Sequence, residues 1–247
     1  MTGTLDEAAR ADQGLGYAVN APYYDLIFPA EARDALAASL RTLLPDVRAV
    51  AEIGPGTGWF TEVLAGLAGE VFAVEPARIM RAALTTRLAR VPHLADRVTV
   101  LPEDALTARP PVPVDAVVMF NLVMHFPPAR RPALWRRWAE ALAPGGLLLV
   151  EPQYPQRAEP VPATTVPGRR LGRRRHDVVT RADVAGDDLV RWVNTYRTWD
   201  GDTLVAAETA EFDCHVISDE RLASELTDAG FEPRPAEGVH AWRRKEN

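Results

Sequence analysis

A glycine-rich turn constrains this chain more than any other feature. The apolar run over residues 50–53 leads directly into Gly54, Gly56 and Gly58, and an amphipathic stretch follows. Glycine permits positive φ and lets a ligand contact the backbone. A helix that starts after such a turn directs its amide groups and the positive end of its dipole toward the turn. The segment therefore predicts a strand–turn–helix unit that binds an anionic or polar ligand.

The spacing of the glycines distinguishes two families of nucleotide-binding protein. A dinucleotide-binding turn requires G-x-G-x-x-G, and here the third glycine comes one residue early, which disfavours a nicotinamide oxidoreductase. The sequence Glu-Ile-Gly-Pro-Gly-Thr-Gly over residues 52–58 instead resembles the first motif of class I S-adenosylmethionine-dependent methyltransferases. In that family the turn faces the methionine part of the cofactor. The resemblance assigns cofactor contacts to Glu52, Gly54, Pro55, Gly56 and Gly58.

Further segments match this family at the expected intervals. Glu75 follows the apolar run over residues 71–74, where a carboxylate can accept hydrogen bonds from both hydroxyls of a ribose. Asp104 follows the run over residues 98–101, where the family contacts the adenine amino group, with Glu103 as the alternative. The resemblance extends to the "L-x-P-G-G-x-L-L-x" sequence over residues 142–150. It places these further residues around the cofactor: Glu75, Pro76, Met80, Asp104, Ala105 and Asn121.

The segment after the fourth apolar run is where this family brings the methyl acceptor to the cofactor. It reads Asn-Leu-Val-Met-His-Phe over residues 121–126 and is not the Asn-Pro-Pro-Tyr motif of enzymes that methylate amino groups of nucleic acids and proteins. If the acceptor is a hydroxyl, His125 is the best candidate for a general base, because its ordinary pKa is close to neutrality. A structural role for His125 is the alternative. An amine acceptor would need only to be oriented.

Tyrosines near the N-terminus form a second group of candidates. The Tyr24-Asp25 pair resembles the "A-x-x-Y-D" segment that lies over the cofactor in many small-molecule methyltransferases, so Tyr24 is expected at the cofactor. Tyr17, Tyr23 and Tyr154 are expected, together with His125, to contact the substrate. The alternative for the N-terminal tyrosines is aromatic packing of a helix on the sheet.

The alternation of apolar runs with amphipathic segments predicts an α/β fold. We expect a Rossmann-like, seven-stranded, mostly parallel sheet with helices on both faces, plus a small antiparallel β insertion before the last helix. The expected divisions are a mobile tail (1–16), a cofactor-binding core (17–151), a substrate lid (152–218) and a segment that completes the core sheet (219–247). Residues 152–168 are rich in proline and predict a loop.

Within the insertion, two short signals carry predictions. The basic run over residues 169–176 is either a solvated loop or a flap that meets an anionic or polar substrate. Asp200-Gly201 between stretches rich in β-forming residues predicts a hairpin, or a small three-stranded sheet.

Composition excludes several classes of function. The formal net charge of −6 gives no indication of a nucleic-acid or membrane binder. The single cysteine, Cys214, excludes an intramolecular disulfide and a cysteine-based zinc site, and the five histidines are scattered, so no metal is expected. No apolar run approaches 18 residues and the N-terminus lacks a signal-peptide pattern, so a cytoplasmic protein is expected.

The resemblance implies transfer of a methyl group from S-adenosylmethionine to an oxygen or nitrogen of a small molecule, with carbon less favoured, in bacterial secondary metabolism. One alternative is an enzyme of the same fold that binds the cofactor but catalyses a cyclisation or rearrangement. Another is a non-catalytic partner subunit, which would not need an intact glycine turn and Glu75. The insertion also resembles dimer surfaces of this family, so a homodimer is expected through it.

Overall fold

The computed structural model describes residues 16–245. Most of the expected N-terminal tail, residues 1–15, lies outside that range, and Gly16 is buried at the start of a helical segment over residues 16–27. The chain divides into two compact units. We call residues 31–156 and 215–247 the core unit, and residues 157–214 with the segment up to residue 30 the β unit. The N-terminal segment therefore groups with the insertion, whereas the sequence analysis assigned residues 17–30 to the core.

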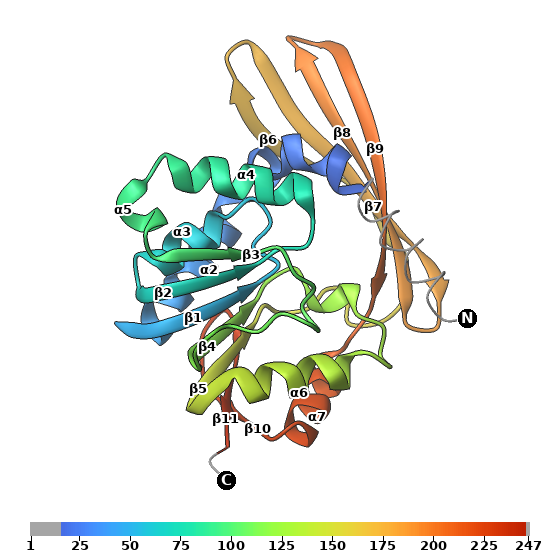
Figure 1. Ribbon diagram of the computed structural model, residues 1–247. Coiled ribbons are helices and arrows are strands. Elements are labelled where there is room, and N and C mark those ends of the chain that lie inside the picture. The colour runs from blue at the N-terminus through green and yellow to red at the C-terminus, as the bar shows by residue number, and fades with distance from the viewer. Residues whose placement is uncertain (1–15, 246–247) are drawn as a thin grey trace, which may run out of the picture. The chain divides into compact units, whose positions relative to one another are not determined.

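The core unit contains the expected seven-stranded sheet (Figure 1). Its strand order is β10-β11-β5-β4-β1-β2-β3. Strand β11 runs antiparallel to both of its neighbours, and the other pairs are parallel. The strands are β1 (Val47–Ile53), β2 (Ala68–Val74), β3 (Val98–Leu101), β4 (Val114–Met119), β5 (Leu142–Val150), β10 (Phe231–Arg234) and β11 (His240–Arg244).

Helices cover both faces of this sheet, as predicted. Alternate residues of β1 face opposite sides: Val50 packs in a cluster with α2 and α3, and Ile53 packs in a cluster with α6 and α7. Each face therefore buries its own apolar layer. The helical segments are α2 (Ala30–Leu43), α3 (Trp59–Ala65), α4 (Arg78–Ala89), α5 (Pro92–Ala95), the 3₁₀ turn η1 (Val123–His125), α6 (Arg131–Ala141) and α7 (Asp219–Asp228).

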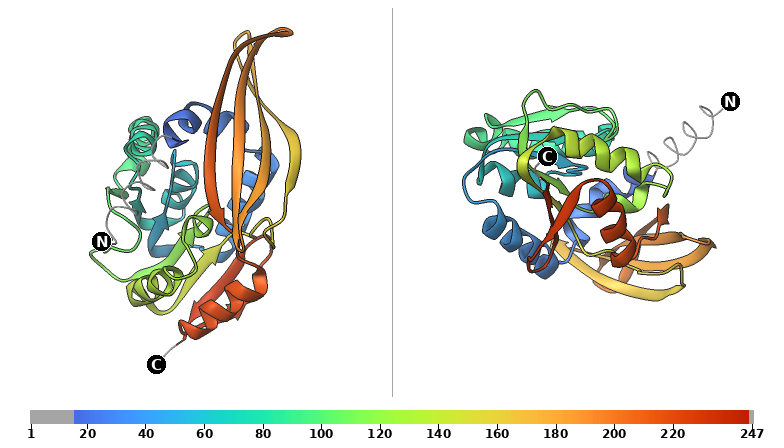
Figure 2. Two further views of the ribbon diagram at one scale, coloured as in Figure 1. Left: turned by 90° about the vertical axis from the view of Figure 1, so that its right-hand side faces the viewer. Right: turned by 90° about the horizontal axis from the view of Figure 1, so that it is seen from below.

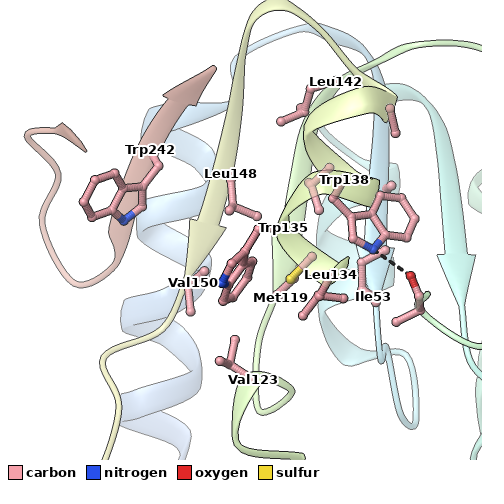
Figure 3. Packing of buried hydrophobic residues seen from close by; sticks show 14 of the residues in the cluster. Ile53, Met119, Val123, Leu134, Trp135, Trp138, Leu142, Leu148, Val150 and Trp242 are labelled. Carbon is pink, nitrogen blue, oxygen red and sulfur yellow. Dashed lines mark hydrogen bonds between the residues drawn. The ribbon is translucent and has the colours of Figure 1, made fainter. Parts of the chain in front are cut away.

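Two tryptophans of α6 dominate the larger apolar layer (Figure 3). Trp135 and Trp138 are almost completely buried against β4 and β5 residues such as Met119 and Leu148. The indole Nε1 of Trp138 donates to the carbonyl of Ala105 at 2.9 Å, so its polar group is satisfied within the core. This bond also fixes the backbone that follows β3.

The β unit is a four-stranded antiparallel sheet in the order β6-β7-β8-β9 (Figure 2). Its strands are β6 (Val161–Leu171), β7 (Arg174–Gly186), β8 (Leu189–Asp200) and β9 (Thr203–His215). The predicted hairpin at Asp200-Gly201 is present, and Gly201 has a φ of 56°. The predicted loop over residues 152–168 is wrong from residue 161 onward, where β6 begins. Strand β6 is an edge strand, where proline is tolerated because one side needs no ladder hydrogen bond.

The basic run forms the β6–β7 hairpin instead of a separate flap. Arg169 and Arg170 lie in β6, Arg174 and Arg175 lie in β7, and Gly172 turns the chain with a φ of 56°.

The N-terminal helical segment packs on the β-unit sheet. The ring of Tyr23 stacks on Tyr196 with centroids 5.0 Å apart, and its hydroxyl donates to Glu208 Oε2 at 2.5 Å. A Cβ on Gly168 of β6 would lie 2.6 Å from Ile27 Cδ1, so the close contact requires glycine there. The alternative interpretation, aromatic packing, therefore accounts for Tyr23, and the sheet that receives it is the insertion.

Candidate active site

The glycine turn has the backbone conformation that its sequence predicts. Gly54, Gly56 and Gly58 have φ values of 74°, 58° and 85°, all in the left-handed region. The amide of Gly54 donates to the carbonyl of Val74 at 2.9 Å, which ties the turn to the end of β2. A Cβ on Gly58 would lie 2.4 Å from Leu84 Cδ1 of α4. Both the positive φ values of the turn and the close contact of Gly58 with Leu84 therefore disfavour any residue larger than glycine.

Glu75 connects this turn to the end of β2. Its Oε2 accepts from the amide of Gly56 at 3.0 Å and its Oε1 accepts from the amide of Ala77 at 2.8 Å. Burial raises the pKa of the Glu75 carboxyl, while these two amides and the Arg81 guanidinium act to lower it. Each carboxylate oxygen has a second lone pair, so Glu75 can still accept from a ligand diol.

Glu52, which the resemblance assigns to the cofactor, makes a structural contact. It is buried at the end of β1, and Thr61 of α3 donates to its Oε2 at 2.5 Å. Burial, opposed by this hydrogen bond and reinforced by the charge of Glu75, raises the pKa of Glu52 to about 8. The group is therefore mostly protonated at neutral pH, and its visible contact fastens α3 to β1.

Of the residues expected near the adenosine part of the cofactor, some are buried in the core and others lie at the surface. Met80 is 2% exposed and belongs to the interior, whereas its neighbour Ile79 is 44% exposed. Ile79 is thus the exposed apolar side chain in the first turn of α4, and sequence reasoning did not consider it. Asp104 Oδ1 accepts from the amide of Leu106 at 2.8 Å and shapes the turn after β3. Pro76 is exposed.

The loop after β4 lies directly against the glycine turn. A Cβ on Gly54 would be 3.0 Å from Leu122 Cδ1, so these two segments are in contact. Asn121 precedes Leu122 with a φ of 52°, which is unusual for a residue with a side chain, and it is exposed. The core unit therefore brings the turn, Glu75 and the Asn121 loop together, as the topology of the sheet predicts.

The environment of His125 disfavours the expected role as a base. His125 ends η1, and its Nδ1 is shielded from solvent. Burial, and to a smaller extent the charge of the neighbouring His215, lowers the pKa of His125 to about 4. At neutral pH the imidazole is uncharged and too weakly basic to remove a proton efficiently.

The substrate tyrosines are spread over both units. Tyr17, Tyr23 and Tyr24 belong to the β unit, where Tyr17 lies 5.9 Å from the ring of Phe212 and Tyr24 lies 6.1 Å from Phe28. Tyr154 belongs to the core unit and is 68% exposed.

Glu151 is a buried acid that the sequence analysis missed. It follows β5 directly, just as Glu75 follows β2. Gln153 Nε2 donates to its Oε1 at 3.0 Å, and burial raises the pKa of Glu151 to about 8. The rule that identified Glu75, an acid at the carboxyl end of a parallel strand, would also have found Glu151.

Two other kinds of site have no support in residues 16–245. No group of three His, Cys, Asp or Glu side chains in this part of the chain is arranged to hold a metal ion. No helix within it is long and apolar enough to cross a membrane.

Comparison with known proteins agrees with this geometry. Residues 51–148, from β1 to β5, match the family model of a methyltransferase domain. The chain therefore contains a methyltransferase domain. Enzymes of this class take their methyl group from S-adenosylmethionine. None of the curated proteins matches the chain significantly.

Solved structures of methyltransferases share the fold. CalS10, an amino pentose methyltransferase from Micromonospora echinaspora, is 24% identical over 87% of this chain and 90% of its own, with a TM-score of 0.69. KedS8, a sugar N-methyltransferase from a Streptoalloteichus species, is 21% identical over 88% of both chains, with a TM-score of 0.68. The CcbJ methyltransferase from Streptomyces caelestis is 19% identical over 88% and 91%, with a TM-score of 0.68. At these identities the likeness concerns the fold.

Replacing Glu75 in this methyltransferase tests the ribose contact. We expect Glu75→Ala to weaken S-adenosylhomocysteine binding by about 1–3 kcal/mol, since hydrogen bonds to a charged group are lost. Isothermal titration calorimetry measures this, with Glu70→Ala on β2 as a control for loss of a carboxylate. Equal affinities for wild type and Glu75→Ala would remove Glu75 from the site.

Proposed function

We propose that this methyltransferase transfers a methyl group from S-adenosylmethionine to a nitrogen or oxygen of a small molecule in bacterial secondary metabolism. The observation that carries the proposal is the arrangement of the Gly54–Gly58 turn. The amide of Gly56 donates a hydrogen bond to Glu75, and Gly54 packs against the loop that contains Asn121. The relatives support a sugar or a related natural product as the acceptor, since two of them are described as amino pentose and sugar N-methyltransferases. The core-unit residues that would hold the cofactor are Gly54, Pro55, Gly56, Gly58, Glu75, Pro76, Ile79, Asp104 and Asn121.

The residues of the turn fit the cofactor because they expose backbone without side chains and Glu75 offers acceptor oxygens. When bound, S-adenosylmethionine supplies a methyl group on an already activated sulfonium. The chain's own residues then have to hold the two reactants in line and exclude water. No strong base is required for an amine that arrives unprotonated.

To test this function, the purified protein is incubated with methyl-labelled S-adenosylmethionine and with a cell extract of a bacterium that makes secondary metabolites. We expect label in the small-molecule fraction and none in protein or nucleic acid. Label in macromolecules would contradict the substrate class. No transfer, despite cofactor binding, would favour the alternative of a cyclisation or rearrangement.

His125 is proposed to orient the acceptor as a neutral imidazole. Because its pKa is about 4, we expect His125→Ala to lower kcat less than about tenfold and to leave the pH profile above pH 6 unchanged. Steady-state kinetics across pH 6–9 measure this. A loss of about 10²–10⁴-fold would instead assign His125 the role of general base.

A second copy of the chain is the proposed partner of the β unit. Among the described residues, strand β9 is at an edge of its sheet, and its exposed Leu204 and Val205 present apolar side chains there. Light scattering would give a dimer for wild type and a monomer for the double variant Leu204→Lys/Val205→Lys. A wild-type monomer would contradict the proposed dimer.

We also propose that the protein is located in the cytoplasm. The presence of a single cysteine supports this location, because disulfide-bonded proteins are typical of oxidising compartments.

A further inference from the structure

Glu151 lies beside the loop where the acceptor is expected. Met119 of β4 pairs with Val150 of β5, so the residues that follow these two strands are neighbours. The backbone amide of Asn121 acts as a hydrogen-bond donor to the Glu151 carboxyl, and Gln153 Nε2 donates to Oε1. The other oxygen, Oε2, is shielded from solvent and has no hydrogen-bond partner among residues 16–245.

An unmatched carboxyl oxygen in the interior is costly. Leaving a buried polar group unpaired is destabilising, and Glu151 is only 8% exposed. Packing alone does not require an acid at this position, and buried polar groups without a partner are rare in folded proteins, whereas carboxyls with strongly shifted pKa values cluster at functional sites. Asn121, whose amide donates to this carboxyl, is exposed, so the residue in contact with Glu151 lies at the surface of the core unit.

The charges around Glu151 leave it without a cationic partner. Burial raises its pKa, opposed by hydrogen bonds from its own amide, from Gln153 and from Asn121, and no charged side chain of residues 16–245 is among the causes. His240, which pairs with Val150 from β11, lies 3.1 Å from Asp219 instead. Neither His125 nor His215 is among the groups that shift the pKa of Glu151.

We propose that Glu151 Oε2 receives the amino group of the methyl acceptor and takes its proton. This rests on the proposed function and narrows the substrate to a small molecule with a primary or secondary amine. The reactive form is the fraction of molecules in which Glu151 has already lost its proton to solvent. The acceptor enters as an ammonium, pairs with that carboxylate, and one N–H proton passes to Glu151. The freed lone pair on nitrogen forms the bond to the methyl carbon as the carbon–sulfur bond breaks, and that electron pair stays on sulfur. Glu151 later releases its proton to solvent.

The acid strengths favour an amine over a hydroxyl. Ammonium groups titrate at roughly 8–10, so transfer to a carboxylate whose pKa is about 8 is close to balanced. An alcohol is a far weaker acid, and neither Glu151 nor the neutral His125 would ionise it.

Glu151→Gln tests the inference because it keeps the shape and removes the proton acceptor. Infrared titration of the free protein should show a protonated-carboxyl band that disappears near pH 8 and is missing in Glu151→Gln. The companion band of Glu52 should persist in the variant. A Glu151 carboxyl that is already ionised at pH 6 would overturn the inference.

Binding gives a second readout. In the presence of saturating S-adenosylhomocysteine, we would titrate methyl glycosides of aminopentoses and aminohexoses, each matched with its hydroxyl counterpart. We expect at least one amine to bind wild type and Glu140→Gln equally, to bind Glu151→Gln at least tenfold more weakly, and to bind more tightly than its hydroxyl counterpart. Equal binding to Glu151→Gln, or no amine binding at all, would overturn the inference. The proposed function stands even if the inference about Glu151 fails, provided that S-adenosylhomocysteine binds the wild type and methyl label still enters small molecules of an extract.

Discussion

Glu225→Ala should lower the free energy of unfolding by about 3–5 kcal/mol, because it leaves a buried guanidinium without its counter-ion. The Glu225 carboxylate of α7 accepts three hydrogen bonds from two residues of α6. Arg131 donates from Nε and Nη2, each at 3.0 Å, and the indole of Trp135 donates at 3.0 Å. Arg131 is itself only 2% exposed. Arg221 donates to the same carboxylate at 2.9 Å. The network therefore fastens α7 to α6.

Urea unfolding measures this, with Glu220→Ala as the matched control on the exposed side of α7. The control removes only a favourable charge in the first helical turn and should cost about 1 kcal/mol or less. Equal stabilities for Glu225→Ala and Glu220→Ala would contradict the account.

The same network has a defined pH dependence. Burial acts to raise the pKa of Glu225, but the hydrogen bonds from Arg131, Trp135 and Arg221 outweigh it, so the pKa lies below its ordinary value. The stabilisation is therefore present above the unfolded-state pKa and is lost as the pH falls through the lower folded-state value.

Gly58→Val should abolish cofactor binding and cost the fold about 2–6 kcal/mol. A β-branched residue at a φ of 85° is strained by about 1–3 kcal/mol, and overpacking against Leu84 adds about 1–3 kcal/mol. The backbone strain and the clash with Leu84 can be relieved only if the turn moves. The backbone amides of the turn and the carboxylate of Glu75 would then no longer be positioned for the cofactor.

Calorimetric titration with S-adenosylhomocysteine and thermal unfolding together measure both effects. Gly66→Ala is the control, since Gly66 has an ordinary helical φ of −80° and a Cβ there would meet Val63 O at 3.3 Å. Normal affinity in a folded Gly58→Val protein would show that the turn does not hold the cofactor.

The sequence predicted the core unit well because its signals are local. Each parallel strand is covered on both faces, so it appears as a short apolar run, as in residues 71–74. The glycine turn requires positive φ, which few residues other than glycine adopt. Glu75 was found because the carboxyl ends of parallel strands meet at one edge of a sheet.

The β unit was predicted less well because its structure depends on contacts distant in sequence. Pro162 and Pro167 made β6 resemble a loop, although an edge strand accommodates them. Tyr23 stacks on Tyr196, and no local pattern reveals such a pair. The pKa of His125 likewise follows from burial that a sequence does not show.

A crystal structure with S-adenosylhomocysteine tests the central claim most directly. We expect the ribose hydroxyls within hydrogen-bonding distance of Glu75 and the amino acid part of the ligand against Gly54–Gly58. A ligand bound away from this turn, or one whose ribose does not contact Glu75, would contradict the account.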